Sequence, residues 1–147
     1  MNEKRVFAVL SSLAAGGNLI YPPEVCDEVL RGAERELDAA CRWIQRTKAH
    51  AERRADFETV RRILRAAPDL VDPDDPYNEA DPYVIALGLE LRSEELTLEL
   101  VAGNEVTIVT EDRNDKPSKL SLTTAAGMVG LPTIPLFALI RIGGVSP

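Results

Sequence analysis

The chain has 147 residues, of which 45% are hydrophobic and 28% are charged, and its formal net charge at pH 7 is −7. This composition is that of an ordinary globular protein and excludes disordered, collagen-like and disulfide-stapled classes, while the length suits one compact domain over residues 1–147. The negative charge argues against binding nucleic acid through bulk electrostatics, although a local basic face could still do so.

The first 32 residues predict a helix, a short strand and a second helix. Apolar residues at helical spacing indicate a helix over 4–15, and a strand over 5–10 is the alternative because valine and phenylalanine favour strands. The apolar run 18–21 indicates a brief strand. Two prolines follow it and suit the start of a helix over 24–32, since the missing N–H of proline would have no partner there.

Two more helices and a possible strand come next. Helical spacing resumes after Gly32 and runs from Leu37 to Ile44. A helix over 55–66 is predicted to place Phe57 on its apolar side, with Val60, Ile63 and Leu64, and its arginines on the other side. Residues 69–71 could then form a short strand.

An acidic, proline-punctuated loop over 72–79 leads to a helix over 81–91, with Asp81 as the N-cap and Pro82 in the first turn. Beyond Ser93 the pattern suits a helix and a strand equally, so the end of this helix stays open.

The last third of the chain mixes strand and helix. A β-branched run over 106–110 predicts a buried strand that ends in the acidic pair Glu111-Asp112, and small and apolar residues predict helices over 122–129 and 136–142. Helices that alternate with short apolar strands indicate an α/β sandwich with a mostly parallel sheet.

Three acidic positions fall where such a sheet would gather functional groups, at the carboxyl ends of its strands. Asp112 follows the strand 106–110, Asp81 opens a helix, and Glu28 lies about one turn into the helix after 18–21. Clustered carboxylates repel one another unless a cation neutralises them. A cluster of this kind therefore implies a bound Mg²⁺ or Mn²⁺.

Four blocks of the sequence resemble the PIN-domain superfamily of metal-dependent nucleases, and in particular its PIN-like bacterial proteins. The resemblance extends from about Val6 to Ile142. Its blocks are PPEVCDEVLRG at 22–32, ADPYVIAL at 80–87, VTED at 109–112 and the closing strand-to-helix segment GLPTIPLF at 130–137.

The resemblance implies a three-layer α/β/α sandwich with a short, mostly parallel sheet. It matches Glu28 to the second acid of the family, Asp81 to the third and Asp112 to the fourth, with Glu111 as the substitute for Asp112. The first strand of the family, which is central in the sheet and ends in an aspartate, has no match here. Either the true start lies upstream of Met1, or the chain is a degraded and inactive copy.

The activity that the resemblance implies is hydrolysis of RNA phosphodiesters, as the toxin of a toxin–antitoxin pair, with RNA and an antitoxin protein as partners. RNA requires positive charge near the acids. The densest basic run of the chain consists of Arg42, Arg46, Lys48, Arg53, Arg54, Arg61, Arg62 and Arg65. The alternative is a non-catalytic PIN-like module that binds a partner protein. Two copies could also pair through the apolar helices near the N-terminus, or through an exposed sheet edge.

Each acidic position also has an ordinary structural interpretation. Asp81 before a proline suits a helix cap, Glu28 could pair with Arg31, and Glu111-Asp112 suits a polar turn. The basic run would then be the solvated face of long helices. The resemblance, rather than any single position, favours the metal site.

The two cysteines offer neither a disulfide framework nor a zinc ligand set, which fits a reducing cytosol. No apolar run approaches the roughly 18 to 20 residues of a membrane span, and the N-terminus lacks the pattern of a secretory signal. We therefore expect a cytoplasmic protein.

Overall fold

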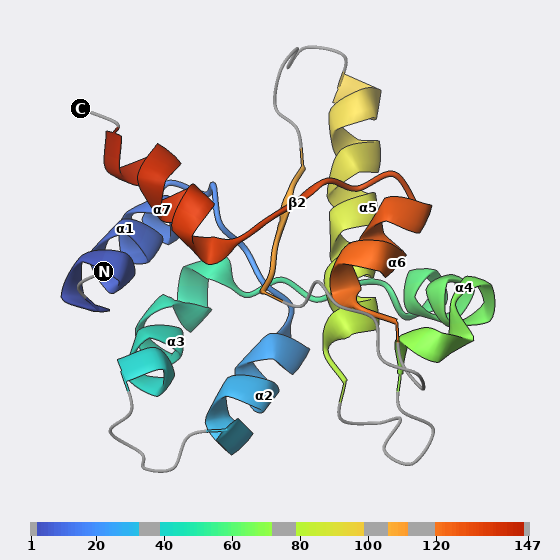
Figure 1. The fold of residues 1–147 in the computed structure, drawn as a ribbon, viewed down its shortest axis with the longest axis horizontal. Helices are drawn as coiled ribbons and strands as arrows, with labels where there is room; N and C mark the ends of the chain where they lie inside the picture. The colour runs from blue at the N-terminus through green and yellow to red at the C-terminus, as the bar shows by residue number, and fades with distance from the viewer. Residues whose placement is uncertain (1–2, 33–38, 72–78, 99–105, 112–119, 146–147) are drawn as a thin grey trace. The chain divides into compact units, whose positions relative to one another are not determined.

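The computed structural model describes residues 3–32, 39–71, 79–98, 106–111 and 120–145. These residues form seven α-helices, one 3-10 helix and two short strands (Figure 1). The chain divides into two compact units, which are described separately below. The first consists of residues 1–54 with 137–147, and the second consists of residues 55–136.

The first unit contains the helices α1 (Glu3–Ala15), α2 (Pro23–Gly32), α3 (Ala39–Ala51) and most of α7 (Leu136–Val145). Both α1 and α2 pack against α3. The Trp43 ring of α3 lies between two aromatic side chains, with its centroid 6.2 Å from that of Phe7 and 5.7 Å from that of Tyr21. These ring contacts join α1 and the segment before α2 to α3.

One strand-like contact occurs in this unit. Tyr21 forms an isolated parallel bridge with Glu52, in which the Tyr21 amide donates to the Ala51 carbonyl at 3.1 Å and the Arg53 amide donates to the Tyr21 carbonyl at 2.9 Å. The predicted strand over 18–21 is therefore reduced to a single bridging residue. Pro22, which follows it, has no N–H with which to continue a ladder.

The second unit contains α4 (Phe57–Ala66), the 3-10 helix η1 (Pro68–Leu70), α5 (Asp81–Leu98), β1 (Ile108–Val109), α6 (Leu122–Met128) and β2 (Thr133–Ile134). The strands are parallel, with Ile108 opposite Thr133 and Val109 opposite Ile134. Helix α5 packs against α4 and against β1.

Gly88 allows the close approach of α5 to the chain before β2. A Cβ atom built on Gly88 would lie 3.0 Å from Leu131 Cδ1, closer than ordinary van der Waals contact. Leu131 is buried, as is Ile85 one turn earlier on α5. The core of this unit is therefore built around α5, with buried residues also supplied by α4, α6 and β1.

Several sequence predictions are confirmed. Helices occur over 3–15, 23–32, 57–66, 122–128 and 136–145, close to their expected bounds, so the alternative strand over 5–10 is wrong. At the boundary left open beyond Ser93, α5 continues as a helix to Leu98. Helix and parallel strand occur together, as the α/β prediction required, although helix predominates; the three-layer sandwich stays a prediction.

Three local predictions are wrong. Residues 69–71 do not form a strand, because Pro68 starts the 3-10 turn that ends at Leu70. Asp81 is the first residue of α5 rather than the residue before it, since the Ala80 carbonyl already accepts from the Val84 amide at 3.0 Å. Phe57 does not lie on the apolar side of α4, because 62% of it is exposed.

None of the helices in the described part of the chain is both long and apolar enough to cross a membrane. The single-domain, cytoplasmic and homodimer expectations stay predictions.

Candidate functional site

Glu28, the first of the predicted metal ligands, lies on α2 in the first unit and is half-buried. Its neighbour Asp27 is exposed. The Arg31 side chain, one turn later on α2, donates a hydrogen bond from Nε to the Asp27 backbone carbonyl at 3.3 Å. Glu28 and Asp27 therefore form a pair of adjacent acids that differ in burial on one helix.

Asp81 lies in the second unit, as the first residue of α5. The residues on either side, Ala80 and Pro82, are buried, and Asp81 itself is half-buried. The first amides of a helix carry partial positive charge, so this position favours an ionised carboxylate. Asp81 has an environment suited to a fixed negative charge.

Glu111 follows β1 at the carboxyl end of the parallel pair. The Thr110 amide donates to the Ile134 carbonyl at 3.0 Å, which carries the pairing one residue past β1. The Glu111 carboxylate then accepts a hydrogen bond at Oε1 from the Leu136 amide, at 2.9 Å. Leu136 is the first residue of α7, so this acid satisfies an amide at a helix start.

The predicted ligand set is divided between the two units and residues outside the described part of the chain. Asp81 and Glu111 belong to the second unit, Glu28 belongs to the first, and Asp112 lies outside the described residues. Across residues 3–32, 39–71, 79–98, 106–111 and 120–145, no group of three or more histidine, cysteine, aspartate or glutamate side chains could hold a metal ion. The metal site stays a prediction.

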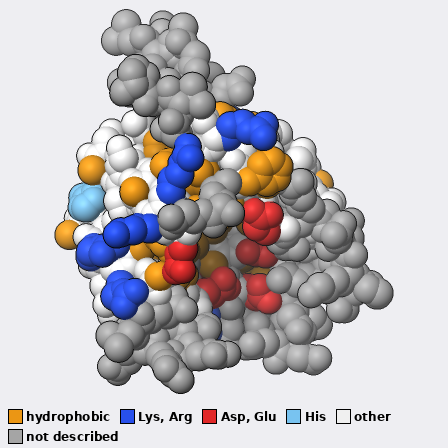
Figure 2. Space-filling view, turned by 60° about the vertical axis from the view of Figure 1, so that its left-hand side comes forward, with side chains coloured by type: hydrophobic (Ala, Val, Ile, Leu, Met, Phe, Trp, Pro, Cys, Tyr) orange, Lys and Arg blue, Asp and Glu red, His pale blue; other side chains and the backbone are white. Residues whose placement is uncertain are grey.

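The predicted nucleic-acid-binding arginines lie on two helices. Arg42 and Arg46 are exposed on α3 in the first unit, whereas the exposed Arg61, Arg62 and Arg65 lie on α4 in the second. On the face drawn in Figure 2, lysine and arginine side chains lie next to hydrophobic side chains. These five arginines are therefore divided between one helix in each unit.

A buried polar cluster in the first unit was not predicted from the sequence. The Tyr21 hydroxyl lies 2.6 Å from Thr47 Oγ1, and the Cys26 thiol donates to Glu52 Oε2 at 3.2 Å. Burial, followed by this hydrogen bond to Glu52, raises the pKa of the Cys26 thiol to about 12. Burial likewise raises the pKa of Tyr21 above its usual value.

This cluster rules out one kind of chemistry. A cysteine nucleophile reacts as its thiolate, which at neutral pH requires a lowered pKa and some exposure. Cys26 has a raised pKa and is 2% exposed. Its thiol is therefore a structural group, and its partner Glu52 is 26 residues away along the chain, so no local pattern could have revealed the pair.

No protein-family model matches the sequence, and comparisons with curated proteins and with solved structures also find no match.

Proposed function

We propose that this chain is a PIN-type endoribonuclease that depends on Mg²⁺ or Mn²⁺ and acts as the toxin of a toxin–antitoxin pair. Its metal ligands would be Glu28, Asp81 and Asp112, in a three-layer α/β/α sandwich. The observation that carries the proposal is the position of the acids in the second unit: Asp81 opens α5, and the acidic pair that begins with Glu111 follows β1 of a parallel strand pair. Functional groups of parallel sheets gather at such ends.

The donor chemistry of these residues also supports the proposal. Carboxylate oxygens are the ligands that Mg²⁺ and Mn²⁺ prefer. A divalent cation bound to them would activate water and neutralise the charge that develops on the phosphate. The chain itself would contribute ionised carboxylates, held in place by the first turn of α5 and by α2, and arginines that bind the RNA backbone.

Cleavage of RNA by the purified full chain tests the proposal. We expect a mixed-sequence RNA to be cut in Mn²⁺ and to remain intact in EDTA, at a rate that is lowered because the first acid of the family has no match in this sequence. Asp81→Asn, Glu28→Gln and Asp112→Asn should each reduce the rate on the order of 100-fold, because each removes a ligand of the cation that would stabilise the transition state. Asp27→Asn, next to Glu28 on α2, is the matched control and should leave the rate unchanged.

A non-catalytic PIN-like module that binds a partner protein is the second candidate. The hydrogen bond from the Leu136 amide to Glu111 favours it, because an acid predicted as a substitute ligand is engaged in holding the fold. This candidate predicts a folded chain that leaves RNA intact and whose Tm does not respond to Mn²⁺.

A further inference from the structure

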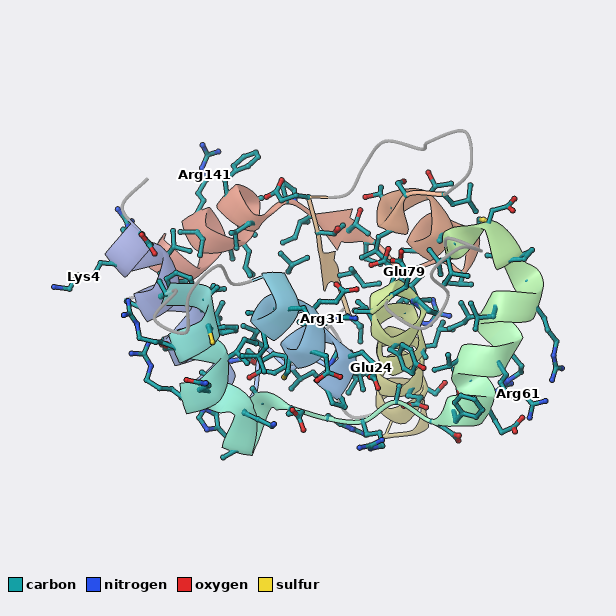
Figure 3. All side chains as sticks on the ribbon, turned by 90° about the horizontal axis from the view of Figure 1, so that it is seen from below. Lys4, Glu24, Arg31, Arg61, Glu79 and Arg141 are labelled. Carbon is teal, nitrogen blue, oxygen red and sulfur yellow. The ribbon has the colours of Figure 1, made fainter. Side chains whose placement is uncertain are left out.

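The outer face of α4 carries an aromatic side chain in line with two arginines. Phe57, Arg61 and Arg65 are four residues apart, so they form one row along the helix, with successive members about 6 Å apart along the axis. All three are exposed. Figure 3 shows Arg61 projecting away from α5, against which α4 packs.

The exposure of Phe57 is unusual for its position. The buried face of α4 consists of Thr59, Val60 and Ile63. Phe57 is not part of this buried face. Asp56 caps the helix by accepting from the Glu58 amide at 3.0 Å, and Phe57 directly follows this cap. Phe57 is thus at the capped start of a helix, with 62% of the residue exposed.

We propose that this row binds single-stranded RNA, with a base stacked on Phe57 and phosphates bound by Arg61 and Arg65. The choice of RNA as the ligand rests on the function proposed above. An exposed aromatic ring stacks on any unpaired base, and neighbouring arginines neutralise the backbone. A base paired in a duplex is already stacked and leaves the ring without a partner, so the surface selects single strands.

Glu58 lies beside the row and competes with the phosphate. Its Oε1 accepts from Arg61 Nη1 at 3.1 Å, and both side chains are more than half exposed. An ion pair in water is weak, so a phosphate can replace the glutamate. Removal of this carboxylate should therefore strengthen RNA binding, a gain that a misfolded variant could not produce.

The test is fluorescence anisotropy with a labelled single-stranded RNA of mixed sequence, about 12 nucleotides long so that it spans one binding surface, in EDTA so that no cleavage occurs. Phe57→Ala should weaken binding by about five- to thirtyfold, and Phe57→Trp should restore it. Arg65→Gln should lower the slope of log affinity against log salt by about 0.7, the value for one phosphate contact on a single strand. Glu58→Gln should tighten binding by about two- to fivefold.

Helix α7 provides a matched control in the same chain. Phe137 is 54% exposed and Arg141 is exposed four residues later, which repeats the aromatic and arginine spacing without a second arginine at the next step. Phe137→Ala should leave RNA affinity unchanged. Equal losses from Phe57→Ala and Phe137→Ala would overturn the assignment to α4.

Other outcomes also decide the matter. The proposal fails if the unmodified chain does not bind the RNA, if Phe57→Ala binds as well as the unmodified chain, or if duplex RNA binds equally well. It also fails if Phe57→Ala converts a dimer of the chain into a monomer without changing RNA affinity, because the outer face of α4 would then bind a second copy of the chain. If the unmodified chain cleaves RNA but Phe57→Ala does not weaken RNA binding, this inference fails and the proposed nuclease function stands. If RNA binding depends on Phe57 but the chain does not cleave RNA, the proposed nuclease function fails and this inference stands.

Discussion

The carboxylate of Glu111 and the amide of Leu136 join the end of β1 to the start of α7 through a 2.9 Å hydrogen bond. The two residues are 25 positions apart, and the α6 helix and β2 lie between them in the chain. A side chain predicted as a substitute metal ligand thus has a structural role.

The hydrogen bond to Leu136 should make Glu111→Ala destabilising. Loss of a side-chain acceptor at a helix start lowers the free energy of unfolding by about 0.5 to 2 kcal/mol. Glu111→Gln keeps a carbonyl oxygen that can accept from the Leu136 amide, so it should retain most of this stability. Urea denaturation of both variants measures the difference; equal stability of Glu111→Ala and the unmodified chain would show that the hydrogen bond contributes nothing.

The close approach of Leu131 to Gly88 predicts that larger side chains at position 88 are harmful. Gly88→Val would press a branched side chain against Leu131, because a Cβ at position 88 would already lie 3.0 Å from Leu131 Cδ1. Overpacking of this kind lowers the free energy of unfolding by about 1 to 3 kcal/mol. Gly127 on α6 is the matched helical control.

A Cβ on Gly127 meets nothing within 4 Å. Gly127→Ala should therefore leave stability unchanged or raise it by up to about 1 kcal/mol, because alanine favours the helix. Thermal unfolding of the two variants compares them directly. If Gly88→Val and Gly127→Ala both have the same Tm as the unmodified chain, the contact between α5 and Leu131 is not tight.

The raised pKa of Cys26 predicts that stability falls in alkaline solution. Below the ordinary thiol pKa of 9.0 the thiol is protonated in both the folded and the unfolded chain, so its contribution does not change with pH. Between pH 9 and about 12 the unfolded thiol ionises while the folded thiol stays protonated. Ionisation then favours the unfolded chain, by about 1.4 kcal/mol per pH unit.

Comparison with Cys26→Ala isolates this effect from Tyr21 and the lysines, which also titrate in alkaline solution. The difference in the free energy of unfolding between the unmodified chain and Cys26→Ala should be constant from about pH 7 to 8 and should shrink as the pH rises above about 9. A difference that stays constant well above this pH would mean that the folded and unfolded thiols have the same pKa.

Helices were predictable from the sequence wherever apolar residues recur at helical spacing, as in α1 and α5. The strand predicted over 106–110 occurs as β1, although only residues 108–109 are paired. The other two strand predictions failed because pairing depends on distant partners: Tyr21 pairs at a single residue with Glu52, and the run at 69–71 follows a proline that starts a 3-10 turn. The position of Asp81 at a helix start was correct to within one residue.

The surface of α4 could not be predicted from composition alone. Phe57 is apolar and fits the helical period of Val60 and Leu64, so periodicity placed it inside. In the structure it follows the Asp56 cap, is 62% exposed and lies in line with Arg61. The Cys26 and Glu52 pair likewise depends on the packing of α2 against the end of α3, which no local pattern encodes.

Calorimetric titration of the full chain with Mn²⁺ tests most directly whether Glu28, Asp81 and Asp112 share a divalent cation. We predict one Mn²⁺ per chain, bound more tightly than millimolar, with binding lost in Asp81→Asn and retained in Asp27→Asn. Absent or millimolar binding by the unmodified chain, or equal binding by the Asp81→Asn variant, would contradict the proposed metal site and the nuclease function that depends on it.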